Sequence, residues 1–236
     1  MDWTAPIDIY CERLSDAFWA EPLNALSNLS FIAAAIWAGM LARRTGVRSA
    51  DTVALIVLAF CVGVGSFMFH TFANGWSSLA DVIPIWTFVA LFTLSAIVRI
   101  GGVKPGKAVT GAVVLIAVLV VVFMAAGTGS DTDNAVAAHE GHSLLNGSEQ
   151  YFPAVIALLV FTFIARRRES PMAPWITLAT ITFISSLTLR TLDMHLCEIW
   201  PNGTHFLWHL LNGLMIGILL DGYIKLQARS QGAAPA

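Results

Sequence analysis

The sequence predicts an all-α integral membrane protein built as a seven-helix bundle, and three observations lead to that prediction. The 236 residues are 57% hydrophobic and only 12% charged, which is about half the charged fraction of an ordinary soluble domain. Mean hydropathy is +0.73. No window alternates apolar and polar residues with the period of a barrel strand. The net charge of −2 gives no reason to expect a nucleic-acid partner.

Seven apolar segments have lengths near the roughly 20 residues that an α-helix needs to cross a bilayer. They are residues 22–42, 52–71, 80–100, 108–126, 151–165, 173–190 and 205–224. The fifth is short between its polar flanks. Because the seven segments fill the chain, we expect one transmembrane domain over residues 1–230. The small and polar residues 231–236 predict a disordered tail.

Basic residues predict the orientation of the bundle. They cluster after the first, third, fifth and seventh segments, in "ARRTGVR", around Arg99 and Lys104, in "ARRRES" and at Arg229. The loops on the opposite side hold several acids and a single basic residue, Arg13. By the positive-inside rule, the N-terminus lies outside and the C-terminus lies in the cytoplasm.

Five polar residues fall at one depth of the predicted membrane domain. Ser66 and His70 lie four residues apart in the outer part of the second segment, and Asp81 lies in the first turn of the third. His205 and His209 have the same spacing at the outer start of the seventh. An ionisable residue in a membrane helix costs about 2.5–3.5 kcal/mol, so such a residue is a functional hypothesis. The sequence therefore predicts a site in the outer half of the bilayer.

Three imidazoles, two of them on one helix face, suit a catalytic zinc ion. Such a site takes three protein ligands and leaves a fourth position for water. Asp81 is the candidate to hold that water and take its proton, and Ser66 is the candidate to donate to an oxyanion. The alternative is that the histidines are packed or hydrated at the membrane interface without a metal.

These residues, together with the N-terminal segment, resemble the alkaline ceramidases. The similar motifs are "GSFMFH" with Asp81 eleven residues after His70, "HFLWH" near the C-terminus, and the opening "DIYCERLSDAFWAEPLNALSNLSF". The resemblance runs from about residue 8 to residue 213. Those enzymes are seven-helix membrane hydrolases in a superfamily that includes progestin/adiponectin-type receptors and lipid-remodelling hydrolases.

The resemblance implies a role for each residue of the predicted site. His70, His205 and His209 would bind zinc, while Ser66 would steady the oxyanion and Asp81 would position the attacking water.

The resemblance also implies a calcium site on the N-terminal segment, where the matching carboxylates are Asp8, Glu12 and Glu21. Leu14 falls where the family has an asparagine ligand, and leucine cannot coordinate, which leaves Asp16 as an alternative. Without the resemblance, these acids could equally be solvated.

The function that follows is a zinc-dependent amidohydrolase that cleaves ceramide, or a related lipid amide, into a sphingoid base and a fatty acid. Its expected partners are that lipid substrate and the membrane lipids. The alternative is a receptor-like seven-helix protein in which zinc is structural and no hydrolysis occurs.

Two cysteines, Cys11 and Cys197, lie on the predicted outer side, where an oxidising compartment permits a disulfide. We predict that they pair and that Cys61, within the second segment, is a free buried thiol.

Four further groups of polar residues have plain interpretations. Asn24, Ser27 and Asn28 share one face of the first helix and suit hydrogen bonds between helices. Asp193 and His195 precede the last helix, where either could support a metal ligand, but solvated loop residues are favoured. Asp221 is expected at the inner interface. His139 and His142 lie in loop 127–150, where a solvated loop is favoured over a metal site.

Overall fold

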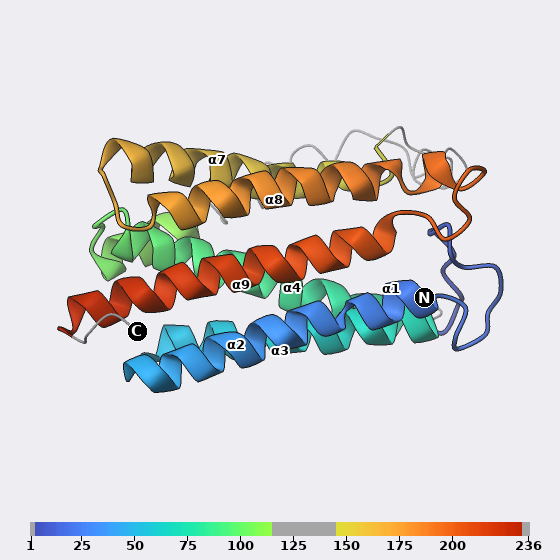
Figure 1. Cartoon of the computed structure of the whole chain (residues 1–236), viewed down its shortest axis with the longest axis horizontal. Helices are drawn as coiled ribbons and strands as arrows, with labels where there is room; N and C mark the ends of the chain where they lie inside the picture. The colour runs from blue at the N-terminus through green and yellow to red at the C-terminus, as the bar shows by residue number, and fades with distance from the viewer. Residues whose placement is uncertain (1–2, 115–144, 233–236) are drawn as a thin grey trace.

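Long apolar helices arranged side by side form the protein (Figure 1). The computed structural model describes residues 3–114 and 145–232. The helices in chain order are α1 (Pro22–Ser27), α2 (Leu29–Thr45), α3 (Ala50–Phe72), α4 (Gly75–Arg99), α7 (Phe152–Arg167), α8 (Ala173–Leu192) and α9 (His205–Ser230). Two 3₁₀ turns, η2 (Ser148–Tyr151) and η3 (Met194–Leu196), precede α7 and follow α8.

Six of the seven predicted segments are helices long and apolar enough to cross a membrane, with α1 and α2 acting as one span and η2 extending α7. The chain is therefore a multi-pass membrane protein. The predicted all-α class is confirmed over residues 3–114 and 145–232, where the structure contains no strand and a single bridge between Pro6 and Asn74.

The predicted fourth span, residues 108–126, lies largely outside the described residues. Residues 105–114 are helical, which agrees with its beginning, and the count of seven stays a prediction. The domain prediction also stays untested: α9 continues to Ser230, and residues 233–236 of the predicted tail are outside the described part.

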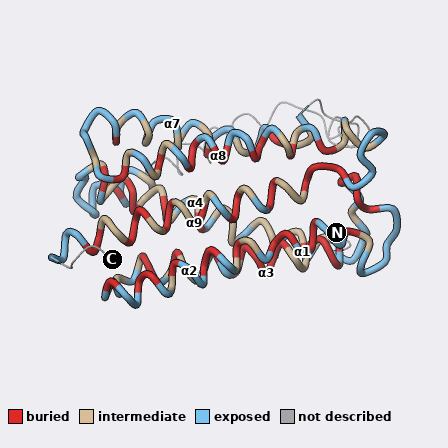
Figure 2. The backbone as a smooth tube through the Cα atoms, in the orientation of Figure 1, coloured by how far each residue is buried: buried red, intermediate tan, exposed pale blue. Residues whose placement is uncertain are grey.

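Helix α9 lies at the centre of the bundle and packs against α8, α2 and α3. Its fully covered side chains include Leu220, Tyr223 and Ile224. Figure 2 shows the buried positions lining the inner faces of the helices and the exposed positions on their outer faces. Many of those outer residues are large and apolar, for example Ile83 and Phe163, as a surface in contact with lipid requires.

The two ends of the bundle differ in charge. Helices α2, α4, α7 and α9 all end at the same end of the molecule, on the left of Figure 1, and each carries arginine in its last turn. We call this the basic end. The opposite end holds the N-terminal segment, the end of α3 and the starts of α4 and α9, and we call it the site end.

Candidate metal centre

Three histidines meet at the site end of the bundle. His70 comes from the last turn of α3, and His205 and His209 come from the first two turns of α9. All three are buried, and one ligand atom from each lies within 4.8 Å of the others. Among the described residues this is the only group of histidines, cysteines and acids that could hold a metal ion. The structure thus brings together the three predicted zinc ligands.

Neighbouring side chains fix which nitrogen carries the proton in two of the three imidazoles. The Nδ1 atom of His70 lies 2.6 Å from Oε2 of Glu21, and a carboxylate can only accept, so Nδ1 donates. The Ser27 hydroxyl donates to the carbonyl of Asn24 at 2.8 Å. Its oxygen is then free to accept from Nδ1 of His209, also at 2.8 Å. Both rings, when neutral, therefore present an unprotonated Nε2.

Those two unprotonated nitrogens face each other. Nε2 of His70 lies 3.1 Å from Nε2 of His209, and two lone pairs at that distance repel unless a cation lies between them. Two nitrogens bound at about 2.0–2.1 Å to a tetrahedral zinc would be separated by about 3.3–3.4 Å. The donor set and its spacing suit zinc.

The third histidine is held by one contact on its ring and one on its backbone. The ring of Tyr10 stacks on His205 with their centroids 3.8 Å apart, and burial raises the pKa of the Tyr10 hydroxyl, which keeps it neutral. The backbone N–H of His205 donates to Oδ1 of Asp193 at 2.9 Å. Nδ1 of His205 is buried and has no hydrogen-bond partner. Such an orphaned nitrogen is expected of a side chain arranged for a ligand.

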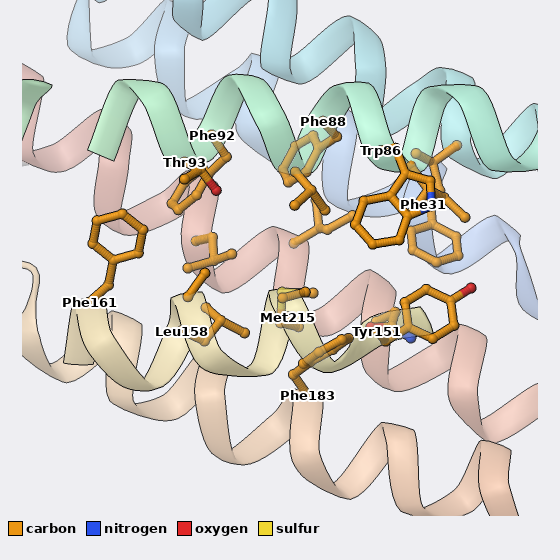
Figure 3. Close-up of a pocket in the computed structure, with 18 of the residues that line it drawn as sticks. Phe31, Trp86, Phe88, Phe92, Thr93, Tyr151, Leu158, Phe161, Phe183 and Met215 are labelled. Atoms are coloured by element: carbon orange, nitrogen blue, oxygen red, sulfur yellow. The ribbon is translucent and has the colours of Figure 1, made fainter. Parts of the chain in front are cut away.

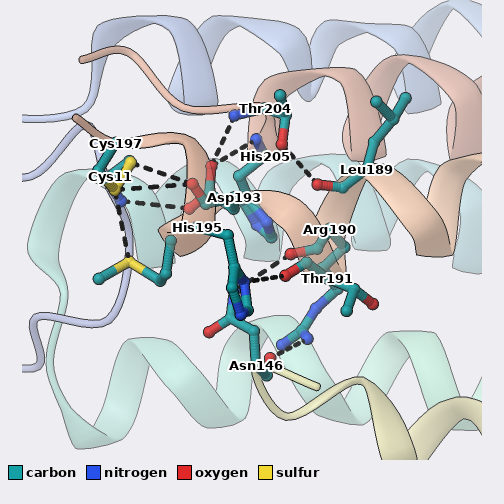
Figure 4. Close-up of a disulfide and its surroundings, with 11 residues drawn as sticks. Cys11, Asn146, Leu189, Arg190, Thr191, Asp193, His195, Cys197, Thr204 and His205 are labelled. Carbon is teal, nitrogen blue, oxygen red and sulfur yellow. Dashed lines mark hydrogen bonds between the residues drawn. A yellow bond between two sulfur atoms is a disulfide. The ribbon is translucent and has the colours of Figure 1, made fainter. Parts of the chain in front are cut away.

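Asp193 corrects the sequence prediction of a solvated residue. Its side chain is fully buried, and it accepts from the amides of Cys11, Thr204 and His205, as Figure 4 shows. A carboxylate can satisfy several amides at once, so it suits this crossing of the N-terminal segment with the start of α9. His195 is exposed, as expected.

A glycine and a disulfide complete this crossing. Gly203 has a φ of +62°, and a Cβ there would lie 2.1 Å from Oδ1 of Asp193 and 2.5 Å from Cβ of Cys11. Only glycine satisfies both limits. Cys11 and Cys197 are paired in the structure, with their Cα atoms 5.4 Å apart (Figure 4). The third cysteine, Cys61, is free but only half-buried, because it lies on the partly exposed side of α3.

Ser66 and Asp81 meet where α3 and α4 touch. Gly65 permits that contact, since a Cβ there would lie 2.0 Å from the carbonyl oxygen of Ala80. Ser66 is buried, and its hydroxyl hydrogen-bonds to the Asp81 carboxylate, which also interacts with the charge of Arg190. Oδ1 of Asp81 is buried and has no partner. The two predicted catalytic residues are therefore paired with each other, and the carboxylate keeps one oxygen free.

The predicted calcium ligands have other partners. Glu12 accepts from the backbone amides of Leu23 and Asn24 at 2.7 and 2.8 Å, and burial raises the pKa of its carboxyl. Burial would also raise the pKa of Glu21, but the hydrogen bonds from His70 and Asn24 and the charge of Arg13 lower it. Asp8 and the alternative Asp16 are exposed.

Comparison with known protein families decides what kind of protein carries this site. The sequence profile of the ceramidase family matches residues 3–235, nearly the whole chain. The chain belongs to the ceramidase family. The resemblance to alkaline ceramidases is thereby confirmed, and the family implies a hydrolase that acts on an amide bond. No significant match was found among curated proteins or among solved structures.

Sequence reasoning missed several residues that build this ceramidase-family site. Arg13 is buried against Glu21, and Tyr10 covers His205. Arg190 is buried in α8, where it donates to the carbonyl of Asn146 and to Ser148 and lies over the ring of Tyr151. The sequence offered one signal for Arg13: it is a basic residue on the predicted outer side, where the positive-inside rule does not favour one. His139 and His142 are outside the described residues.

An apolar pocket begins beside the polar site of this ceramidase-family chain (Figure 3). It encloses about 850 Å³ of empty space, including the part open to the surroundings, between α4, α7 and α9. Val62, Ile85 and Asn212 in its lining lie one helical turn towards the basic end from Ser66, Asp81 and His209 respectively. Phe88, Phe92, Leu158 and Phe161 continue the lining along α4 and α7.

Proposed function

We propose that this chain is a zinc-dependent intramembrane amidohydrolase that cleaves the amide bond of ceramide or of a closely related lipid amide. The observation that supports it best is the pair of unprotonated Nε2 atoms facing each other 3.1 Å apart, with His205 beside them and a free Asp81 oxygen among the buried atoms nearby. His70, His205 and His209 would hold a zinc ion, which would supply Lewis acidity and lower the pKa of a water to about 7.

The residues of the chain have separate tasks in the cleavage. The free oxygen of Asp81 orients the attacking water and accepts its proton. The Ser66 hydroxyl, which hydrogen-bonds to Asp81 in the resting site, turns to donate to the oxyanion that develops on the amide carbonyl. Proton return to the nitrogen releases the sphingoid base, and the acyl part leaves as a fatty acid. Glu21 and Ser27 keep the imidazoles oriented throughout.

The pocket supports a lipid amide as the substrate. Its lining is aliphatic and aromatic except for a few polar groups such as Thr93 and Asn212, and a hydrocarbon chain gains by leaving water for such a surface. Because the pocket begins one turn from Ser66, Asp81 and His209, a chain lying in it places its carbonyl at the histidines. The acyl chain extends towards the basic end.

The arrangement of charge supports the orientation predicted from the sequence. The arginine-rich helix ends lie together at the basic end, which we place in the cytoplasm by the positive-inside rule. The metal centre then lies in the outer half of the bilayer, on the side that also holds Cys11 and Cys197.

The test is hydrolysis of a panel of ceramides and other lipid amides by purified protein of known zinc content. We expect release of base and fatty acid by wild type. We expect Asp81→Asn to keep its zinc but lose activity by about 10²–10⁴-fold, because an amide cannot take the proton. A zinc-loaded wild-type protein that hydrolyses none of the panel would favour the receptor-like alternative with structural zinc.

A further inference from the structure

The N-terminal segment contains a buried positive charge, the guanidinium of Arg13. Arg13 is only 5% exposed, although it lies in a loop outside the helices. Its Nε donates to Oε1 of Glu21. Its Nη1 donates to the carbonyl of Ser15 at 3.1 Å, and its Nη2 donates to the carbonyl of His70 at 3.2 Å. One guanidinium thus joins the segment to Glu21 and to the backbone of a predicted metal ligand.

The carboxylate of Glu21 is fully used by this arrangement. Oε1 receives Arg13, and Oε2 receives Nδ1 of His70 at 2.6 Å and the side-chain amide of Asn24 at 3.0 Å. Glu21 is itself buried. A buried carboxylate needs a positive partner to stay ionised, and Arg13 is the partner that approaches it from the N-terminal segment.

The donors of this segment do not suit a calcium ion. Calcium takes six to eight oxygen ligands at about 2.3–2.6 Å. Of the residues matched to the calcium site of alkaline ceramidases, Glu12 is bound to the amides that begin α1, and Glu21 is bound to Arg13 and His70. Asp8 is exposed, and Leu14 is 87% exposed and has no side-chain oxygen. A divalent ion at Glu21 would also meet the charge of Arg13.

We propose that the Arg13 guanidinium occupies the place where the resemblance implies calcium, and that it is the fixed positive charge that holds Glu21 against Nδ1 of His70. Arg13 is a positioning residue, and it acts on the metal centre through Glu21 and through the carbonyl of His70. The metal centre of this protein is therefore independent of calcium. The inference rests on the proposed function only in taking His70 as a zinc ligand.

The first experiment needs no substitution. Wild-type protein in calcium-free buffer, with zinc supplied, is titrated with CaCl₂ to about 1 mM, a concentration that weak extracellular calcium sites require. Calcium binding is measured by equilibrium dialysis with radioactive calcium, and thermal unfolding is followed in parallel. A ligand that binds the folded state raises the unfolding temperature. We expect no stoichiometric binding and no shift. One calcium bound per chain with a raised unfolding temperature would overturn the proposal.

The second experiment removes the guanidinium. Arg13→Gln keeps hydrogen-bonding capacity but loses the charge. We expect its zinc affinity, measured by competition with a chromogenic chelator, to fall by about 10–100-fold, as is typical when a residue supporting a ligand is lost. Arg13→Lys keeps a charge without the planar fork and should recover part of that affinity. The control is Arg48→Gln, which changes an exposed arginine at the other end of the bundle and should leave zinc affinity unchanged.

The outcomes separate the two proposals. Wild-type zinc affinity in Arg13→Gln would overturn the role of Arg13. If that variant does not fold, the calcium titration of wild type decides by itself. A wild-type protein that binds no zinc would contradict the proposed function. The proposal for Arg13 would still be tested by the thermal unfolding of that protein, because an unfolding temperature raised by calcium would contradict it.

Discussion

Helix α9 begins in a buried polar cluster and ends in a second, partly exposed one, and the two clusters are built differently. At the site end it contributes His205 and His209, and at the basic end it contributes Tyr223 and Gln227. Both clusters contain an aspartate from a neighbouring helix, Asp81 from α4 and Asp51 from α3. Comparing them shows which features distinguish a site from a structural network in a membrane bundle.

The basic-end cluster is closed. Asp51 accepts from the Arg99 guanidinium and from the hydroxyl of Tyr223. Gln227 donates to Thr52 at 2.6 Å and accepts from Ser49 at 2.7 Å. Each polar side chain uses its neighbours as partners, so this cluster joins α3, α4 and α9 at little cost in unpaired groups.

The site-end cluster is open. Over residues 3–114 and 145–232, the buried side-chain atoms without a hydrogen-bond partner belong to Asn24, Asn28, Asp81, His205 and Asn212, and all five residues lie in or beside the metal centre. Unpaired buried groups cost free energy, and their concentration at one end is what a site that receives a ligand and a substrate would show.

The largest expected effect comes from removing a histidine from the open cluster. His70→Ala, His205→Ala or His209→Ala should lose zinc and hydrolysis together, because three ligands are already the minimum of a catalytic zinc site. Metal analysis and lipid-amide hydrolysis on the same preparation check this. His195→Ala is the matched control, since His195 is exposed. Full zinc content in any of the three variants would break the comparison.

Ser66→Ala should reduce activity less than the loss of a histidine does, and it should reduce turnover without reducing zinc content. The loss of one oxyanion donor typically lowers kcat by about 10²–10³-fold. Zinc content should stay at the wild-type value, because Ser66 lies against Asp81 and is not one of the three clustered histidines. A KM that rises while kcat is unchanged would instead assign Ser66 to substrate binding.

The disulfide should matter for stability more than for chemistry. Cys11→Ser or Cys197→Ser should lower the free energy of unfolding by about 2–4 kcal/mol and loosen the crossing at Asp193. The measurement is denaturant unfolding together with mass spectrometry under non-reducing conditions. Two cysteines that can both be alkylated in the native protein would rule out the pairing.

The smallest effect is expected at the closed cluster. Tyr223→Phe removes a hydroxyl that donates to Asp51 and accepts from Arg99. It should lower the free energy of unfolding by about 1.5–3 kcal/mol and leave zinc content and turnover unchanged. A loss of zinc in this variant would mean that the two clusters are coupled along α9 and that the closed cluster is not purely structural.

The residues of the open cluster could be predicted from the sequence because they lie on helices, whose regular geometry fixes the face and depth of each residue. His205 and His209 share a face because they are four residues apart. The directions in which α3, α4 and α9 cross the membrane place Ser66, His70 and Asp81 at the same depth as these histidines. No such rule exists for loops. Asp193 has the sequence context of a solvated residue, and only the fold of the chain around Gly203 buries it. The engagement of Glu21 by Arg13 depends likewise on a loop path that no periodicity predicts.

The metal centre is assembled from parts of the chain that are made at different times. His70 and His209 are 139 residues apart, so a ribosome adding about 5–20 residues per second completes the pair about 7–28 s after His70 is made. Arg13 and Glu21 are made before His70. Nδ1 of His70 can therefore pair with Glu21 before α9 has been synthesised. We expect zinc to enter only after the last helix has inserted, so a nascent chain that stops short of α9 should be inserted in the membrane and free of metal.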